Sequence, residues 1–243
     1  MQVRGRKAST AGPVLFHDHR NDDQWAWAAA VSVSAALRRE LEARPRARLL
    51  VSGGSTPAPV FRALSQAPLE WSRVDIALVD ERWLLPDDPD SNAHLVREHL
   101  LRAHAAEARF ESLTRPGRSI DAAVADANLL ARNAPAMVLL GMGGDGHTAS
   151  LFPHMRGLDD ALASANAYVA VDATGCPGAG PWPLRISLTP AGLEPAAARL
   201  LLLRGQDKRD VFERALAGGD PRDMPVRMAF RAPGATLHVH WCH

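Results

Sequence analysis

Short apolar segments alternate with helix-like segments along most of this chain. The apolar segments are rich in Val, Ile and Leu and lie at 47–51, 74–80, 136–141, 167–171, 184–189, 199–205 and 235–241. The segments between them, rich in Ala, Leu and charged residues, are typical of helices and lie at 22–43, 58–64, 91–103, 119–133 and 207–218. Strands that alternate with helices form a mostly parallel sheet with helices on both faces. The predicted fold is therefore α/β, with an open, Rossmann-like sheet.

Residues with capping preferences support several of these helix boundaries. Asp22 or Asp23 is suited to cap the first helix, and Ser91 or Asn92 is suited to cap the third. Pro57 lies near the first position of the second helix, where its missing N–H costs nothing.

The length and composition fit one large domain. The chain has 243 residues, of which 47% are hydrophobic and 23% charged, enough to bury a sizeable core. It begins with the basic, polar segment "MQVRGRKASTAG", so we expect residues 1–13 to be a flexible N-terminal tail rather than a signal peptide. Residues 14–243 are expected to form a single domain, in which the Pro- and Gly-rich segment 174–183 is a loop.

The charge and the cysteines argue against several classes of partner. The formal net charge is +1, so no overall field favours nucleic acid or an anionic membrane. No apolar segment approaches the length of a membrane span. The two widely spaced cysteines fit a reducing cytoplasm. We expect a cytoplasmic protein that binds a small molecule, as a monomer, with a weak homodimer as the alternative.

Three of the expected strands end in turns that carry reactive or anion-binding residues. These turns are "SGGSTP" at 52–57, "VDERW" at 79–83 and "GMGGDGHTAS" at 141–150. Ligands of open parallel sheets bind beyond the carboxyl ends of the strands. We therefore expect the three turns to contribute to one site.

The first turn is a candidate phosphate cradle. Gly53 and Gly54 let the backbone turn tightly, Ser52 and Ser55 add hydroxyl groups, and the start of the next helix adds free N–H groups. The spacing and the lysine of a Walker A motif are absent. The alternative is a plain strand-to-helix turn in which a Ser or Thr caps the helix.

The second turn places charged groups where a strand ends. The planar guanidinium of Arg82 is suited to grip a phosphate, and Asp80 is suited to accept a proton or to orient a sugar hydroxyl. The alternative is a surface turn whose charges pair with one another and contribute little.

The third turn admits three interpretations. It contains a literal G-x-G-x-x-G, as dinucleotide sites do, and "GGDG", as some kinase loops do. A dinucleotide loop needs a long helix after it, but Pro153 allows only a short helix from Thr148 or one that restarts later. No acidic cluster is poised for magnesium, which disfavours the kinase interpretation.

The third interpretation is a glycine-rich turn that presents a histidine to a substrate. Gly143 and Gly144 let the backbone approach a ligand, and Asp145 and His147 follow at the strand end. Histidine is the natural general base near neutral pH. The alternative is a turn histidine that has no partner.

Two histidine clusters raise the possibility of a metal site. "HDH" at 17–19 lies in what we expect to be a polar turn, and His238 and His240 in "HVHWCH" alternate along a strand and would share one face. Neither cluster has the spacing of a four-ligand zinc site, so we expect no functional metal.

Taken together and in order, the motifs resemble those of the 6-phosphogluconolactonases, within the glucosamine-6-phosphate isomerase/6-phosphogluconolactonase family. The resemblance spans roughly 45–218 and rests on "SGGSTP", "VDERW…PDDPDSNAHLVREHLL", "VLLGMGGDGHTASLFP" and "PWPLRISLTPAGLEPAAARLLLLRGQDKRDVFERAL". The related deaminases typically carry tyrosine after the acidic pair and an asparagine–glutamate pair in the later loop. This chain has "DER" and "GGDGHTASLFP" there, which favours the lactonases.

The resemblance implies hydrolysis of 6-phospho-D-glucono-1,5-lactone to 6-phosphogluconate, in the oxidative pentose phosphate pathway. It implies that His147 is the base, with Asp145 and Asp80 as further catalytic candidates, and that no cofactor is needed. Lys208 and Arg185 join the first two turns as candidates for binding the phosphate. The alternatives are a deaminase or isomerase on the same scaffold and a sugar-phosphate sensor without catalysis.

Overall fold

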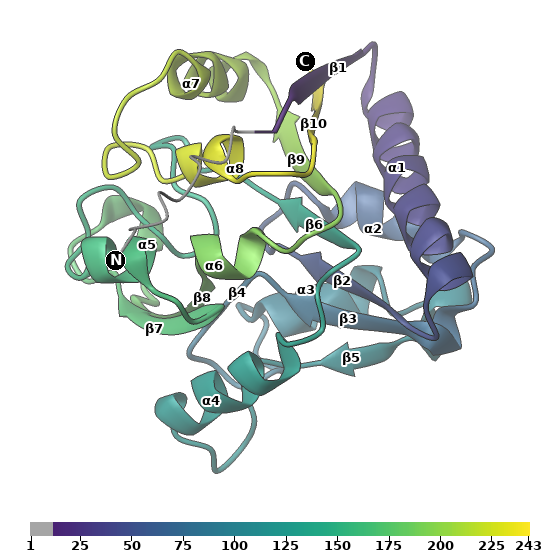
Figure 1. The fold of residues 1–243 in the computed structure, drawn as a ribbon, viewed down its shortest axis with the longest axis horizontal. Coiled ribbons are helices and arrows are strands. Elements are labelled where there is room, and N and C mark those ends of the chain that lie inside the picture. Colours follow the sequence, from purple (N-terminus) through teal and green to yellow (C-terminus); the bar gives the residue numbers. More distant parts are fainter. Residues whose placement is uncertain (1–11) are drawn as a thin grey trace, which may run out of the picture.

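The computed structural model describes residues 12–243 and contains two β-sheets (Figure 1). The larger sheet has seven strands in the order β1-β10-β9-β6-β2-β3-β5, and all neighbouring strands are parallel. In that order the strands are Val14–His19, Leu237–Cys242, Arg199–Arg204, Met137–Leu140, Ala47–Val51, Val74–Leu78 and Arg109–Glu111. The smaller sheet is antiparallel, in the order β4 (Asp80–Arg82), β8 (Leu184–Leu188) and β7 (Tyr168–Asp172).

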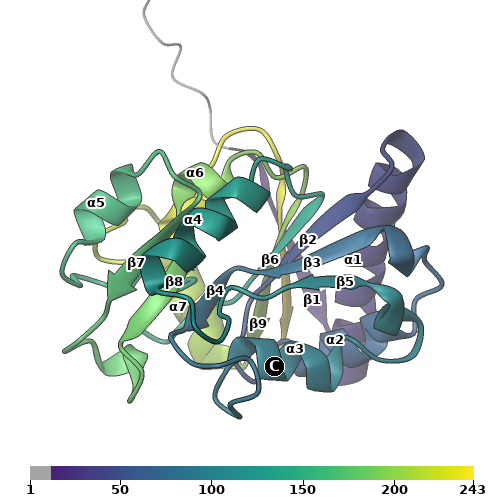
Figure 2. The same cartoon turned by 90° about the horizontal axis from the view of Figure 1, so that it is seen from below.

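Helices lie on both sides of the larger sheet. The α-helices α1 to α8 are Asp22–Ala43, Ala58–Ser65, Asn92–His99, Ile120–Leu130, Leu158–Ala163, Pro190–Leu193, Gln206–Leu216 and Arg227–Arg231. The 3₁₀-helices η1 to η3 are Trp71–Arg73, Ala103–Glu107 and Pro177–Ala179. Figure 2 shows α2 and α3 on one side of the larger sheet, with α4 and α6 on the other. This confirms the predicted α/β class with a mostly parallel open sheet.

The chain passes from the larger to the smaller sheet at Val79. Its N–H donates to the carbonyl of Val51 in β2, and its carbonyl accepts from the N–H of Leu188 at the end of β8, both at 2.8 Å. The predicted strand 74–80 therefore ends at Leu78, and Asp80 begins β4. The smaller sheet was not predicted as a separate unit.

Several local expectations were wrong. "HDH" lies in β1, the edge strand of the larger sheet, rather than in a polar turn, and the three-residue strand β5 was missed as well. The side chain of Asn21 caps α1 by accepting from the N–H of Gln24, so neither Asp22 nor Asp23 is the cap. The prediction of Ser91 as the cap of α3 is confirmed, because its hydroxyl accepts from the N–H of Ala93.

One buried apolar cluster includes side chains from both sheets, for example Leu139 in β6 and Ile186 in β8. Strands β2, β3 and β6 are buried along their whole length, as expected for the centre of a parallel sheet. That residues 14–243 form a single domain remains a prediction. Most of the predicted tail, residues 1–11, lies outside the described residues. Within residues 12–243, no helix is both long and apolar enough to cross a membrane.

The histidines of β1 and β10 face one another across the parallel pair. His17 Nε2 lies 3.0 Å from His238 Nδ1, and His19 Nε2 lies 3.1 Å from His240 Nδ1. Burial lowers the pKa of His240 to about 3, and the neighbouring histidines add to this effect. His238 and His240 share one face of β10, as predicted, and their ring nitrogens bond to those of His17 and His19 in β1.

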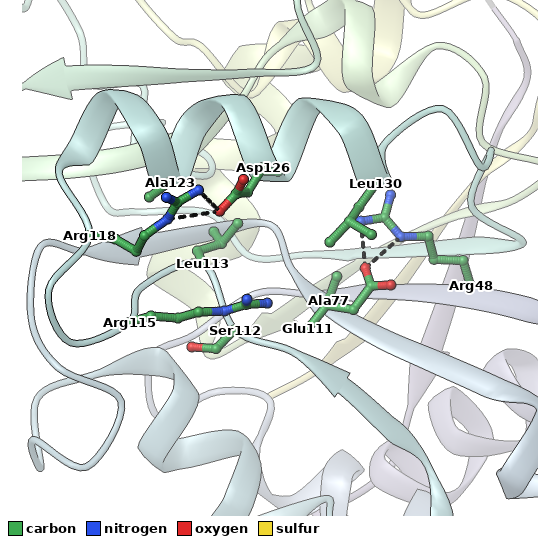
Figure 3. A pocket seen from close by; sticks show the side chains of 11 residues that line it. Arg48, Ala77, Glu111, Ser112, Leu113, Arg115, Arg118, Ala123, Asp126 and Leu130 are labelled. Carbon is green, nitrogen blue, oxygen red and sulfur yellow. Dashed lines mark hydrogen bonds and ion pairs between the residues drawn. The ribbon is translucent and has the colours of Figure 1, made fainter.

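A buried ion pair joins β2 to β5 beside a small pocket under α4 (Figure 3). The guanidinium of Arg48 donates to Glu111 Oε2 from Nε at 3.1 Å and from Nη2 at 2.9 Å. Both side chains are less than a tenth exposed. The pocket holds only about 20 Å³, too little for a sugar phosphate. Arg48 and Glu111 therefore satisfy one another within the fold.

Glu111→Gln is expected to lower the free energy of unfolding by about 3–5 kcal/mol, because it leaves the Arg48 charge buried without a counter-charge. Asp126→Asn is the matched control in the same view, since its pair with Arg118 at 2.6 Å is largely solvated and is expected to contribute less than about 1 kcal/mol. Urea denaturation of both variants measures the difference. Equal losses in the two variants would contradict a structural role for the Arg48–Glu111 pair.

Candidate active site

The three predicted turns converge on one cleft of about 460 Å³. Strands β2 and β6 are neighbours in the larger sheet, so the turns that follow them leave from the same edge. The segment predicted as the second turn is instead the short strand β4, which reaches the cleft because it follows β3 after Val79 alone. The cleft is lined by Ser52, Gly53, Gly54, Ser55, Thr56, Asp80, Arg82, Asp90, Asn92, Gly141, Met142, Gly143, His147, Ala149, Gly178, Ala179, Gly180, Pro181, Trp182, Arg185 and Lys208.

The turn after β2 presents polar groups that have no partner within the described residues. The hydroxyl of Ser52 is buried and makes no hydrogen bond in residues 12–243. Gly53 lies so close to Asn92 that a Cβ there would be 1.8 Å from Asn92 Oδ1, and Gly54 has a φ of +85°. The N-cap of α2 is Pro57, and no described side chain caps the helix. The alternative interpretation, in which Ser or Thr caps the helix, is therefore wrong, because α2 begins only after the turn.

The acidic side chains of "VDERW" are buried, so the surface-turn interpretation is also wrong. Glu81 is fully buried, and its carboxylate accepts from Ser91 Oγ and from the N–H groups of Arg82, Asn92 and Ala93 at 2.8–2.9 Å. Burial raises the pKa of Glu81 to about 7, against the opposing effect of these hydrogen bonds. Glu81 thereby ties β4 to the start of α3.

Arg82 reaches the cleft from this anchored strand. Its Nη1 donates to the carbonyl of Asp90 at 2.6 Å, while its Nε is buried without a hydrogen-bond partner in the described chain. A buried donor without a partner is costly, so ligand oxygens are a natural complement for it.

Asp80 belongs to a buried network beside the cleft. Its Oδ2 accepts from the hydroxyl of Ser150 at 2.6 Å and lies 4.0 Å from Nη1 of Arg185. Arg185 also donates from Nε to the carbonyl of Trp182 and from Nη2 to the carbonyl of Ala179. All three guanidinium nitrogens of Arg185 thus have partners within the protein. Arg185 is therefore less free to hold a phosphate than the sequence suggested.

His147 and Asp145 form a hydrogen-bonded pair. His147 Nδ1 lies 2.6 Å from Asp145 Oδ1, and the imidazole packs against Phe152 with ring centroids 4.4 Å apart. Burial alone would raise the pKa of Asp145, but the hydrogen bonds from His147 outweigh it and hold the pKa below its usual value. The partnerless-histidine alternative is therefore wrong. With Nδ1 protonated toward Asp145, Nε2 is left as the basic nitrogen.

The glycines of this turn make room for the imidazole. A Cβ on Gly143 would lie 2.1 Å from His147 Nδ1, and Gly146 has a φ of +83°. The N–H of Gly143 donates to the carbonyl of His147 at 2.8 Å and is therefore engaged. No helix begins at Thr148; the next helix is α5 at Leu158, so the extended helix of a dinucleotide site is missing here.

Lys208 comes from α7 and completes the cleft wall. Its Nζ donates to the carbonyl of Met142 at 2.8 Å, so the ammonium group is held beside the third turn. Burial lowers the pKa of Lys208, while Asp145 acts in the opposite direction. Lys208 is thus a partly desolvated cation at the cleft, not a solvated helix residue.

Most of the predicted site residues come together, and a few others were missed. Of the predicted set, only Gly144 and Asp145 are not in the cleft wall, and Asp145 lies directly behind His147. Asp90, Asn92, Gly178 and Trp182 line the cleft but were not predicted as site residues. In the sequence, Asn92 was recognised only as a candidate helix cap. Gly178 and Trp182 were recognised only as members of the loop 174–183. No three His, Cys, Asp or Glu side chains within residues 12–243 are arranged to hold a metal ion.

The fold and the cleft together define a class of protein. It is an α/β protein whose cleft combines a glycine-rich turn, three cationic side chains and a histidine that is hydrogen-bonded to an aspartate, a set suited to acid–base chemistry on a small anionic substrate.

The chain belongs to the family of glucosamine-6-phosphate isomerases/6-phosphogluconolactonase, whose model matches residues 20–241. It is 54% identical to a 6-phosphogluconolactonase of Xylella fastidiosa (strain Temecula1), over 91% of this chain and 94% of that one. It is 44% identical to a 6-phosphogluconolactonase of Pseudomonas aeruginosa, over 87% and 88% of the two chains. A solved 6-phosphogluconolactonase of Shewanella baltica OS155 superposes with a TM-score of 0.88 at 33% identity, covering 96% of this chain and 100% of that one.

Proposed function

We propose that this protein hydrolyses 6-phospho-D-glucono-1,5-lactone to 6-phosphogluconate, the hydrolytic step of the oxidative pentose phosphate pathway. The observation that carries the proposal is the His147–Asp145 pair, at 2.6 Å, in the same cleft as the donors of Ser52 and Arg82 that have no partner among residues 12–243. The names of the relatives support the same reaction.

His147 acts as the general base. Its Nε2 takes a proton from a water molecule as the water oxygen attacks the lactone carbonyl carbon. The tetrahedral intermediate then collapses with cleavage of the bond to the ring oxygen, and Nε2 returns the proton to that oxygen. Asp145 holds the ring through Nδ1 and stabilises the imidazolium that forms in between. A lactone is an activated ester, so these steps need no covalent nucleophile.

The substrate phosphate occupies the cradle of Ser52, Gly53, Gly54 and Ser55. Arg82 supplies its free Nε and Lys208 its ammonium group. Asp80, fixed by Ser150 and close to Arg185, orients a sugar hydroxyl between the two ends of the cleft. Arg185 contributes charge near this point while its N–H groups hold the surrounding chain.

The test is direct. The purified protein, added to freshly generated 6-phosphogluconolactone, is expected to accelerate loss of the lactone well above its spontaneous hydrolysis. Phosphate binding without acceleration would point to the sensor instead. Ammonia released from glucosamine 6-phosphate would point to the deaminase alternative.

We further propose that the protein works in the cytoplasm as a monomer. The free thiols of Cys176 and Cys242 support a reducing compartment. Sedimentation at micromolar concentration tests the monomer, and a stable dimer there would exclude it.

A further inference from the structure

The loop 174–183, between β7 and β8, contacts both halves of the site. At one half, Gly178 lies against the histidine pair: a Cβ there would be 2.8 Å from Asp145 Oδ2 and 3.3 Å from His147 Nδ1. Only a glycine lets the loop approach the pair this closely. The loop therefore forms part of the wall behind the base.

At the other half, the side chain of Trp182 reaches the phosphate end. Its indole Nε1 donates to Asp90 Oδ2 at 2.9 Å. The carbonyl of the same Asp90 accepts from Arg82 Nη1 at 2.6 Å. Asp90 therefore bonds to the loop through its side chain and to Arg82 through its backbone.

Arg185 fixes the loop between these two contacts. Its guanidinium is buried and donates to the carbonyls of Ala179, at 2.6 Å, and Trp182, at 2.8 Å. A buried group thereby holds the backbone on either side of Pro181, while Trp182 itself is 37% exposed.

We propose that Trp182 is a positioning residue for the phosphate end of the site, acting on Arg82 through Asp90. Arg82 must keep its Nη1 on the Asp90 carbonyl for the free Nε to face the substrate phosphate. The Trp182 indole holds Asp90 in the position that makes this possible. This inference takes the identity of the substrate from the proposed function. The hydrogen bonds that link Trp182, Asp90 and Arg82 are present whether or not the protein hydrolyses that substrate.

Trp182→Phe keeps an aromatic ring and removes the N–H donor. We expect KM for the lactone to rise about five-fold, as for the loss of one ordinary hydrogen bond, and kcat to stay within about two-fold. Asp90→Ala is expected to raise KM by at least as much, and Trp182→Phe is expected to add nothing in the Asp90→Ala background. Trp27→Phe, on the exposed face of α1, is the control and should change neither constant.

The decisive comparison uses Arg82→Ala as background. If Trp182 acts through Arg82, Trp182→Phe leaves the already raised KM of Arg82→Ala unchanged. A further five-fold rise in that background would mean that Trp182 contacts the substrate directly, and it would overturn the proposal. A fall in kcat with KM unchanged would overturn it too.

Calorimetric binding of inorganic phosphate separates this inference from the proposed function. If the wild-type protein binds phosphate but does not hydrolyse the lactone, the proposed function is refuted. In that case a Trp182→Phe variant that binds phosphate five-fold more weakly than the wild type would still support the positioning role. A wild-type protein that binds no phosphate, or a Trp182→Phe variant with unchanged phosphate affinity, would refute the positioning role.

Discussion

Replacing His147 with Gln is expected to lower kcat for lactone hydrolysis by about 10²- to 10⁴-fold, the usual contribution of a well-placed general base. Glutamine keeps a polar side chain of similar reach but cannot take a proton from water. KM is expected to change less than about three-fold, because the phosphate end of the cleft is untouched. Steady-state kinetics, corrected for spontaneous hydrolysis, measure both constants.

His104→Gln is the matched control, since His104 is exposed in η2 and does not line the cleft. It is expected to retain wild-type kinetics, and both variants should unfold at the wild-type temperature. Full activity of His147→Gln would show that another group is the base. Loss of activity together with loss of thermal stability would leave the Gln variant unsuitable, and His147→Asn would then be compared in its place.

Arg82→Ala is expected to raise KM by about 10- to 100-fold, which corresponds to the loss of a charge-assisted hydrogen bond of about 1.5–3 kcal/mol. The reason is the Nε of Arg82, which lines the same cleft as the Ser52 hydroxyl; both atoms are buried and have no partner in the described chain. Arg82→Lys should recover only part of the loss, because an ammonium group lacks the planar fork. kcat at saturation is expected to fall less than KM rises.

Arg118→Ala serves as the control for removing a guanidinium, because Arg118 pairs with Asp126 and neither residue lines the cleft. It should leave KM unchanged. If Arg82→Ala lowered kcat at unchanged KM, Arg82 would instead stabilise the transition state at the reacting carbonyl, and the phosphate would have to bind elsewhere.

The elements of the fold that were predicted correctly are those whose sequence pattern matches their burial. Strand β2 and helix α1 are examples, because a fully buried strand is continuously apolar and a long helix carries a repeating apolar face. Strand β1 was missed because an edge strand is half exposed and carries His and Asp, which suggest a turn. Strand β5 is too short to show a period.

The core of the candidate site could also be predicted, since each key group lies in a turn directly after a strand. Ser52 and His147 are examples, and the topology of a parallel sheet brings such turns together, while Arg82 reaches the same cleft from strand β4. The partnership of His147 with Asp145 is local, two residues apart, and so was within reach of the sequence.

Asp90 and Trp182 lie in irregular loops 92 residues apart in the chain, and no periodicity relates them. The sequence also could not show that Arg185 donates hydrogen bonds to the carbonyls of Ala179 and Trp182. These hydrogen-bond partners depend on how the two sheets meet at Val79, whose backbone bonds to the larger sheet at Val51 and to the smaller sheet at Leu188.

Local sequence patterns encode burial and chain direction, so the α/β class, the strand ends at the cleft and the histidine among them could be predicted. Which polar groups already have partners, and which have none in residues 12–243, depends on contacts between distant segments that form only when the chain folds. Arg82 keeps an Nε without a partner in residues 12–243, whereas the guanidinium group of Arg185 supports a loop. The difference lies in distant carbonyl groups that the fold places within 3 Å of Arg185.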